Sequence, residues 1–103
     1  MALLHPTREE LDVANVLHAL SDPQRLGIVS ALAEDPTPRR CGSFEVCVTK
    51  STLTHHFRVL REAGVIDQRE EGTARLNSLR REDLDARFPG LLDAVLAAVP
   101  VPA

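Results

Sequence analysis

The sequence lacks tryptophan and tyrosine and has only three phenylalanines among its 103 residues. It also lacks any apolar run close to the roughly 18 residues that a membrane-spanning helix needs, so no membrane partner is expected. The first ten residues, MALLHPTREE, have neither the basic start nor the long apolar stretch of a secretory signal. We therefore expect a cytoplasmic protein with two reduced cysteines and a core of leucine, valine and alanine.

The length of the chain limits the number of domains. A chain of 103 residues has room for one hydrophobic core, and 44% of its residues are hydrophobic, which is enough to build one. We therefore predict a single domain over residues 1–103, with residues 1–6 and 100–103 as tails.

Charge is distributed unevenly along the sequence. The net charge is −3, but residues 39–81 contain nine lysines and arginines against five acidic residues, a local net charge of +4. The rest of the chain carries −7. A basic middle in an acidic protein suits a polyanion that binds on one side, although an ordinary solvated surface explains the charges equally well.

Two helices are predicted in the first third of the chain. The first covers residues 7–20, with Thr7 as its cap and Glu10 completing a capping box. The second covers residues 23–33, because Asp22 is a favourable cap and Pro23 a favourable first residue. Residues 34–40 hold two prolines and are expected to form a loop. Residues 41–48 fit either one helical turn or a short extended piece. The apolar stripe expected on the first helix consists of Val13, Val16, Leu17 and Leu20.

The remaining chain is predicted to form a helix, a β-hairpin and a last helix. A helix over residues 49–64 is bounded by Thr49 as its cap and Gly64 at its end. The hairpin strands are expected at residues 65–69 and 74–79, joined by a turn at 70–73. A helix over residues 81–99 has a wide apolar stripe and a kink or split at Phe88-Pro89-Gly90. The expected fold is mainly α-helical with a small β-hairpin.

The helix predicted at residues 49–64 carries the clearest functional pattern. Its inner face holds Leu53, His56, Phe57 and Leu60, while hydroxyl and basic side chains gather on the outer face. Short hydroxyl side chains allow close approach to DNA, and a helix N-terminus adds amide donors and partial positive charge. This arrangement suits a recognition helix in the major groove, although many ordinary amphipathic helices also have a polar face. The candidate DNA-binding residues on this helix are Lys50, Ser51, Thr52, Thr54, His55 and Arg58.

The order of the elements predicts a winged helix-turn-helix. The hairpin would be the wing, and Arg69 and Arg75 on its strands are candidates for contacts with phosphates or the minor groove. Glu70 and Glu71 at the expected tip carry the wrong charge for deep insertion into a groove.

Three segments of the sequence resemble the ArsR/SmtB family of small bacterial transcriptional regulators: ALSDPQRLGIVSAL, KSTLTHHFRVLREAGVI and REEGTARLNSL. The resemblance covers about residues 10–98. It implies a homodimeric winged-helix repressor, less often an activator, that binds a palindromic operator in double-stranded DNA. It also implies a dimer interface made by the first and last helices, here residues 8–20 and the C-terminal dimerisation helix at 81–99.

Many members of that family sense metals, but neither common ligand pattern is present here. In place of the family's Cys-Val-Cys, the sequence has CGSFEVCV, where Cys41 and Cys47 stand six residues apart. Residues 81–99 contain no histidine, which the other common site requires. No metal or cofactor is therefore expected. Two alternatives remain open: a non-standard metal site of Cys41 and Cys47 with His5 or His18, and a thiol switch at the cysteines. His18 is expected on a dimer surface or in the core, and His56 inside the domain.

Two other classes of function compete with that of a DNA-binding regulator. An enzyme is not expected, because Cys47, His55 and His56 fall in the segment interpreted as a DNA reader and no glycine-rich phosphate loop is present. A winged-helix module that binds protein rather than DNA remains an alternative, because the net charge is negative.

Overall fold

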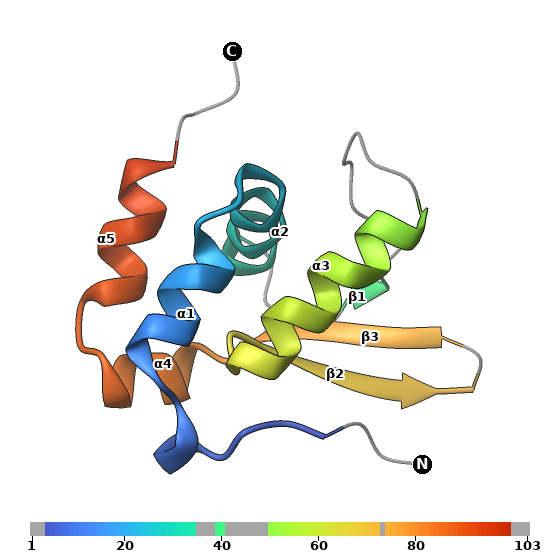
Figure 1. The fold of residues 1–103 in the computed structure, drawn as a ribbon, viewed down its shortest axis with the longest axis horizontal. Coiled ribbons are helices and arrows are strands. Elements are labelled where there is room, and N and C mark those ends of the chain that lie inside the picture. The colour runs from blue at the N-terminus through green and yellow to red at the C-terminus, as the bar shows by residue number, and fades with distance from the viewer. Residues whose placement is uncertain (1–3, 35–38, 41–49, 73, 100–103) are drawn as a thin grey trace.

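The structure is a computed structural model that describes residues 4–34, 39–40, 50–72 and 74–99. Helices form most of it, and a short antiparallel sheet lies beside them (Figure 1). Along the chain the elements are a 3-10 helix at Arg8–Glu10, α1 at Val13–Leu20, α2 at Pro23–Glu34, β1 at Arg39–Arg40, α3 at Lys50–Ala63, β2 at Ile66–Glu71, β3 at Ala74–Leu79, α4 at Arg81–Arg87 and α5 at Leu91–Ala98.

The first predicted helix is shorter than expected. The backbone amide of Thr7 donates to Glu10 Oε1 at 2.9 Å, but this pair caps only the 3-10 helix. Leu11 is extended, and Asp12 then caps α1 by accepting from the amide of Ala14 at 2.8 Å. The prediction of one helix over residues 7–20 was therefore wrong, because Asp12 is a second cap inside that span.

The apolar stripe expected on the first helix divides into two parts. Val16 and Leu20 are buried, with 1% and 4% of their surface exposed. Val13 and Leu17 are instead 44% and 47% exposed. Two apolar side chains of α1 thus lie outside the core of this chain.

The second helix begins as its sequence predicts. The carboxylate of Asp22 accepts from the amides of Gln24 at 2.8 Å and Arg25 at 3.3 Å, and Pro23 is the first helical residue. The loop expected at residues 34–40 needs a correction, because Arg39–Arg40 forms β1 and pairs with β3. Residues 41–48 and the expected cap Thr49 lie outside the described residues.

The predicted hairpin is confirmed: β3 covers the predicted residues, and β2 runs two residues further toward the turn than expected. The sheet order is β1-β3-β2, and both pairings are antiparallel. Glu70 and Glu71, assigned to the turn, instead end β2 and pair with Arg75 and Ala74. Gly72 takes φ +62 in the turn, a conformation that favours glycine.

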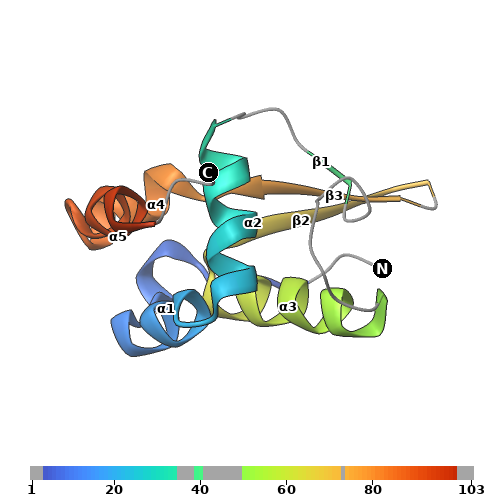
Figure 2. The same cartoon turned by 90° about the horizontal axis from the view of Figure 1, so that it is seen from above.

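The last predicted helix splits where the sequence indicated. α4 ends at Arg87, α5 begins at Leu91, and Gly90 between them adopts the left-handed conformation with φ +82. Both helices lie at the end of the hairpin away from its turn, while α1 and α3 lie together on one side of the sheet (Figure 2).

The segment before α1 packs against the sheet and α4. Residues up to 6 were expected to form a tail, yet His5 Nε2 accepts from the amide of Gln68 on β2 at 2.9 Å. The carbonyl of Pro6 accepts from the guanidinium of Arg80 at 2.7 Å. This segment therefore covers part of the outer edge of β2.

One core joins the helices and the hairpin. Most of its buried apolar side chains come from α1, α2, α3 and β2, and α4 and α5 add one leucine each. Leu11 before α1 and Val65 before β2 complete it. No helix in the described part of the chain is long and apolar enough to cross a membrane. The core residues are Leu11, Val16, Ala19, Leu20, Ile28, Val29, Leu32, Phe57, Leu60, Ala63, Val65, Ile66, Leu84 and Leu92.

Candidate nucleic-acid interface

Helix α3 has one buried face and one exposed face, as its sequence predicts. His56, Phe57 and Leu60 are buried, with 6%, 1% and 0% of their surface exposed. Lys50 begins the helix, but its side chain is not among those described. The polar face projects from the body of the domain over the first two and a half turns of α3. Its exposed candidate residues are Ser51, Thr52, Thr54, His55 and Arg58.

An acidic side chain shares that face. Arg58 Nε donates to Glu62 Oε1 at 2.8 Å, one helical turn further along. This hydrogen bond lowers the pKa of Glu62 and raises that of Arg58. Glu62 therefore stays ionised at neutral pH and competes with any phosphate for the guanidinium of Arg58.

His56 lies inside the domain, as expected, and its partner is Arg25 of α2. Arg25 is 7% exposed, and its guanidinium bonds to His56 Nδ1 at 3.2 Å. Because arginine only donates, Nδ1 is the acceptor and the ring proton lies on Nε2. The same guanidinium donates to the carbonyls of Ala19 at 2.6 Å and His18 at 3.3 Å. Arg25 thus joins the end of α1 to the buried face of α3.

The role of Arg25 was missed by the sequence analysis. One local signal could have indicated it: Pro23 stands four residues after Ala19 and has no amide hydrogen to donate to that carbonyl. A nearby donor is needed there, and Arg25 supplies it.

The wing residues Arg69 and Arg75 are both exposed on the hairpin. Arg69 lies 3.7 Å from the carboxylate of Glu71, and Arg75 stands opposite Glu70 across the two strands. The basic residues of the wing are therefore interleaved with acids. This pattern favours contacts with a phosphate backbone over insertion into a minor groove.

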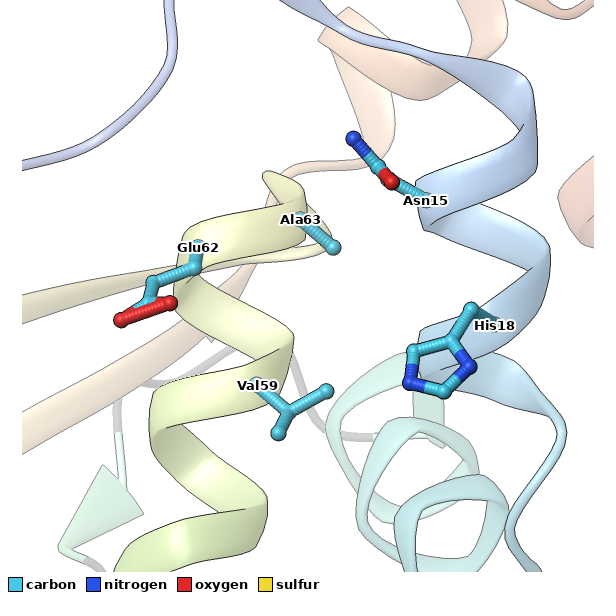
Figure 3. Close-up of a pocket in the computed structure, with 5 residues that line it drawn as sticks. All are labelled: Asn15, His18, Val59, Glu62 and Ala63. Carbon is cyan, nitrogen blue, oxygen red and sulfur yellow. The ribbon is translucent and has the colours of Figure 1, made fainter.

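His18 borders an open cleft between α1 and α3. The cleft has a volume of about 370 Å³ and is lined by Asn15, His18, Val59, Glu62 and Ala63. Asn15 and His18 project from α1 toward α3, whereas the carboxylate of Glu62 points away from α1 (Figure 3). His18 is exposed, so the structure places it on the surface rather than in the core.

Metal ligands do not gather in the part of the chain that the structure describes. Within those residues, no three side chains of histidine, cysteine, aspartate or glutamate lie close enough together to hold a metal ion. Cys41 and Cys47 fall outside them. Of the other candidates, His5 bonds to β2 and His18 lies at the cleft.

Known proteins with similar sequences are transcriptional regulators. The profile described as "Bacterial regulatory protein, arsR family" matches residues 22–68. The chain is 34% identical over 84 residues to YceK of Bacillus subtilis, an uncharacterised HTH-type transcriptional regulator, covering 80% of this chain and 84% of that protein. It is also 34% identical over 70 residues to the biofilm growth-associated repressor of Xylella fastidiosa, covering 63% of this chain and 61% of that protein.

Solved structures agree with the sequence comparisons. The crystal structure of the transcriptional repressor BigR from Xylella fastidiosa superposes with a TM-score of 0.64 and 27% identity, over 87% of this chain and 88% of that one. An ArsR family regulator with 21% identity, RHA00566, has the same fold, with a TM-score of 0.66 over 82% of this chain and 88% of its own. The predicted winged helix-turn-helix is confirmed, and the chain is a regulator rather than an enzyme. Its sequence and fold together place the chain in the ArsR family of bacterial HTH-type transcriptional regulators.

Proposed function

We propose that this regulator represses transcription by binding, as a homodimer, to a palindromic operator in double-stranded DNA. The observation that carries the proposal is the exposed face of α3, where Ser51, Thr52, Thr54, His55 and Arg58 project together. Similarity in sequence and in structure to a repressor from Xylella fastidiosa supports the direction of regulation.

The first half of α3 would enter the major groove. Thr54 and Ser51 are short enough to let the helix approach base edges, and Arg58 is long enough to reach guanine or a phosphate. Lys50 at the start of the helix adds charge near the partial positive charge of the helix N-terminus. Arg69 and Arg75 on the wing would contact the flanking backbone.

The exposed apolar side chains of α1 support a dimer. Val13 and Leu17 lie on α1 with nearly half of their surface exposed, and apolar area of this kind is commonly covered by a partner. Leu91, Val95 and Leu96 on α5 are only partly buried and extend the candidate interface. A two-fold dimer presents two copies of α3 to half-sites about 34 Å apart, which is why a palindromic operator is expected.

DNA binding is tested with duplexes selected by the protein from a random pool. Arg58→Ala should weaken binding by about 10- to 100-fold if Arg58 contacts a base. Arg81→Ala is the matched control, because Arg81 also forms an ion pair, with Asp93 at 2.9 Å, yet belongs to α4 and not to α3 or the wing. We expect no change in affinity for that variant.

A salt series separates this function from its main alternative. A DNA-binding regulator loses affinity steeply and linearly with the logarithm of salt concentration. If no duplex is selected and no such slope is seen, the module binds protein rather than DNA. Unchanged affinity for both Arg58→Ala and Thr54→Ala would contradict the assignment of α3 as the recognition helix.

An effector, if the regulator has one, would act through Cys41 and Cys47 in this proposal. Both cysteines precede α3 in the sequence, so joining them to each other or to a metal would shift the start of that helix. Coupling of this kind is typically worth about 1–3 kcal/mol in DNA affinity. Operator affinity is measured for the wild type and the Cys41→Ser/Cys47→Ser double variant when reduced, when oxidised, and with zinc, nickel or arsenite. An equal response of both proteins would exclude the thiols as the sensor.

A further inference from the structure

Two amide side chains are buried between the hairpin and the helices. Gln68 on β2 is 3% exposed and Asn77 on β3 is 0% exposed. The two residues are directly paired across the strands, and Gln68 Nε2 donates to Asn77 Oδ1 at 2.7 Å. Burying an amide is unfavourable unless it is hydrogen-bonded, so this pair depends on its partners.

A third residue links the pair to α3. Arg61, in the last turn of α3, donates from one terminal nitrogen to Gln68 Oε1 at 2.8 Å. Its Nε is buried with no hydrogen-bond partner among the described residues, so the bond to Gln68 is the one that fixes this side chain. The backbone of Gln68 is also held, because its amide donates to His5 Nε2 at 2.9 Å. Gln68 is thus fixed through both its side chain and its backbone.

The position of this pair along the hairpin is informative. On the same face, the preceding pair toward α4 is apolar and joins buried Ile66 to Leu79. The next pair toward the turn, Glu70 with Arg75, is exposed. Gln68 and Asn77 therefore form the last buried pair before the hairpin leaves the body of the domain. α3 runs beside the hairpin (Figures 1 and 2).

We propose that Arg61, Gln68 and Asn77 are positioning residues that set the wing at a fixed distance and angle from the recognition helix. Hydrogen bonds impose a direction and a length, whereas apolar contacts alone would permit the strands to slide against α3. With the wing fixed, Arg75 and the exposed face of α3 reach the same DNA duplex together. This inference rests on the proposed DNA-binding function.

The test measures how strongly a wing contact depends on Gln68. Gln68→Met keeps a similar length but can neither accept from Arg61 nor donate to Asn77. In the wild type, Arg75→Ala should weaken binding to a duplex selected by the wild type by roughly five- to tenfold. In the Gln68→Met protein the same Arg75→Ala change should cost nothing further, because the wing no longer reaches its phosphate. Gln68→Met alone should also reduce the slope of log affinity against log salt concentration by about one relative to the wild type, because one phosphate contact is lost.

Two controls separate positioning from simple loss of stability. Thr54→Ala, on α3, should weaken binding by the same factor with and without Gln68→Met. Ile66→Val weakens the packing of the neighbouring pair but leaves the hydrogen bonds intact, so the effect of Arg75→Ala should persist there. If Gln68→Met does not fold, Arg61→Met provides the same test, because it keeps an apolar stem in place and removes the donor to Gln68 Oε1.

The outcomes are distinct. An equal cost of Arg75→Ala in the wild type and in folded Gln68→Met would overturn the positioning role and leave the pair as a structural feature. Failure of the wild type to bind any duplex would instead overturn the proposed function, and this inference with it.

Discussion

The buried guanidinium of Arg25 allows a quantitative test of how the recognition helix is held. Arg25→Met keeps the apolar part of the side chain but removes the bonds to Ala19, His18 and His56. The carbonyl of His18 still accepts a hydrogen bond from the hydroxyl of Ser21 at 2.6 Å. The acceptors left without a donor are therefore the carbonyl of Ala19 and His56 Nδ1. Losing one charge-assisted bond and leaving a buried acceptor unpaired should cost about 2–4 kcal/mol of unfolding free energy.

Urea unfolding followed by circular dichroism measures this cost. The midpoint should fall by roughly 1–3 M with an unchanged m-value, at one fixed protein concentration because a dimer's stability depends on it. Arg25→Lys should lose less stability than Arg25→Met, since a lysine ammonium can donate to one of the two acceptors. Arg81→Met is the surface control and should shift the midpoint little. A loss below about 1 kcal/mol for Arg25→Met would refute the idea that Arg25 supports the junction of α1 and α3.

Three further outcomes are expected. Glu62→Gln should raise operator affinity a few-fold by releasing Arg58 from its ion pair, measured by fluorescence anisotropy; weaker binding would show that the pair itself orients Arg58. Burial alone would raise the pKa of Asp22, but hydrogen bonds from two backbone amides outweigh burial and lower the pKa. The ionised carboxylate therefore stabilises the folded protein above about pH 4, and this stabilisation is lost as the pH falls further. Asp22→Asn should therefore match the wild type at pH 7 and lose less stability between pH 4 and 2; equal acid sensitivity of the two proteins would exclude this carboxylate as a contributor. Leu17→Glu should give a folded monomer in sedimentation, whereas Leu4→Glu, at an exposed leucine outside α1, should not; an intact dimer in both would place the interface elsewhere.

Burial decides which apolar residue is suited to a test of the dimer. Leu92 lies in residues 81–99, the segment that the sequence places at the dimer interface. The structure shows Leu92 to be 2% exposed and packed with Leu84 in the core of its own chain. A charge there would unfold the monomer, so Leu17, which is 47% exposed, is the better position.

The sequence by itself determined the order of the elements and the two faces of α3. These features follow from local physics: the spacing of apolar residues sets a helical face, Asp22 with Pro23 starts a helix, and Gly64 at φ +83 ends one. Local signals failed at Asp12, which caps α1 inside the span that Thr7 was expected to begin. They also missed β1 at Arg39–Arg40, because that strand depends on pairing with β3.

Only the tertiary structure decided which polar side chains are buried and what they bind. Arg25 meets His56 across 31 residues of chain, and Gln68 meets Arg61 and Asn77 at separations of seven and nine. No periodicity encodes such pairs, because each depends on where separate elements pack. The same holds for Val13 and Leu17: their spacing matches that of Val16 and Leu20, but the core of one chain covers only one side of α1. Helical spacing predicts that apolar residues share a face, whereas packing decides whether the core of the chain or another surface covers it.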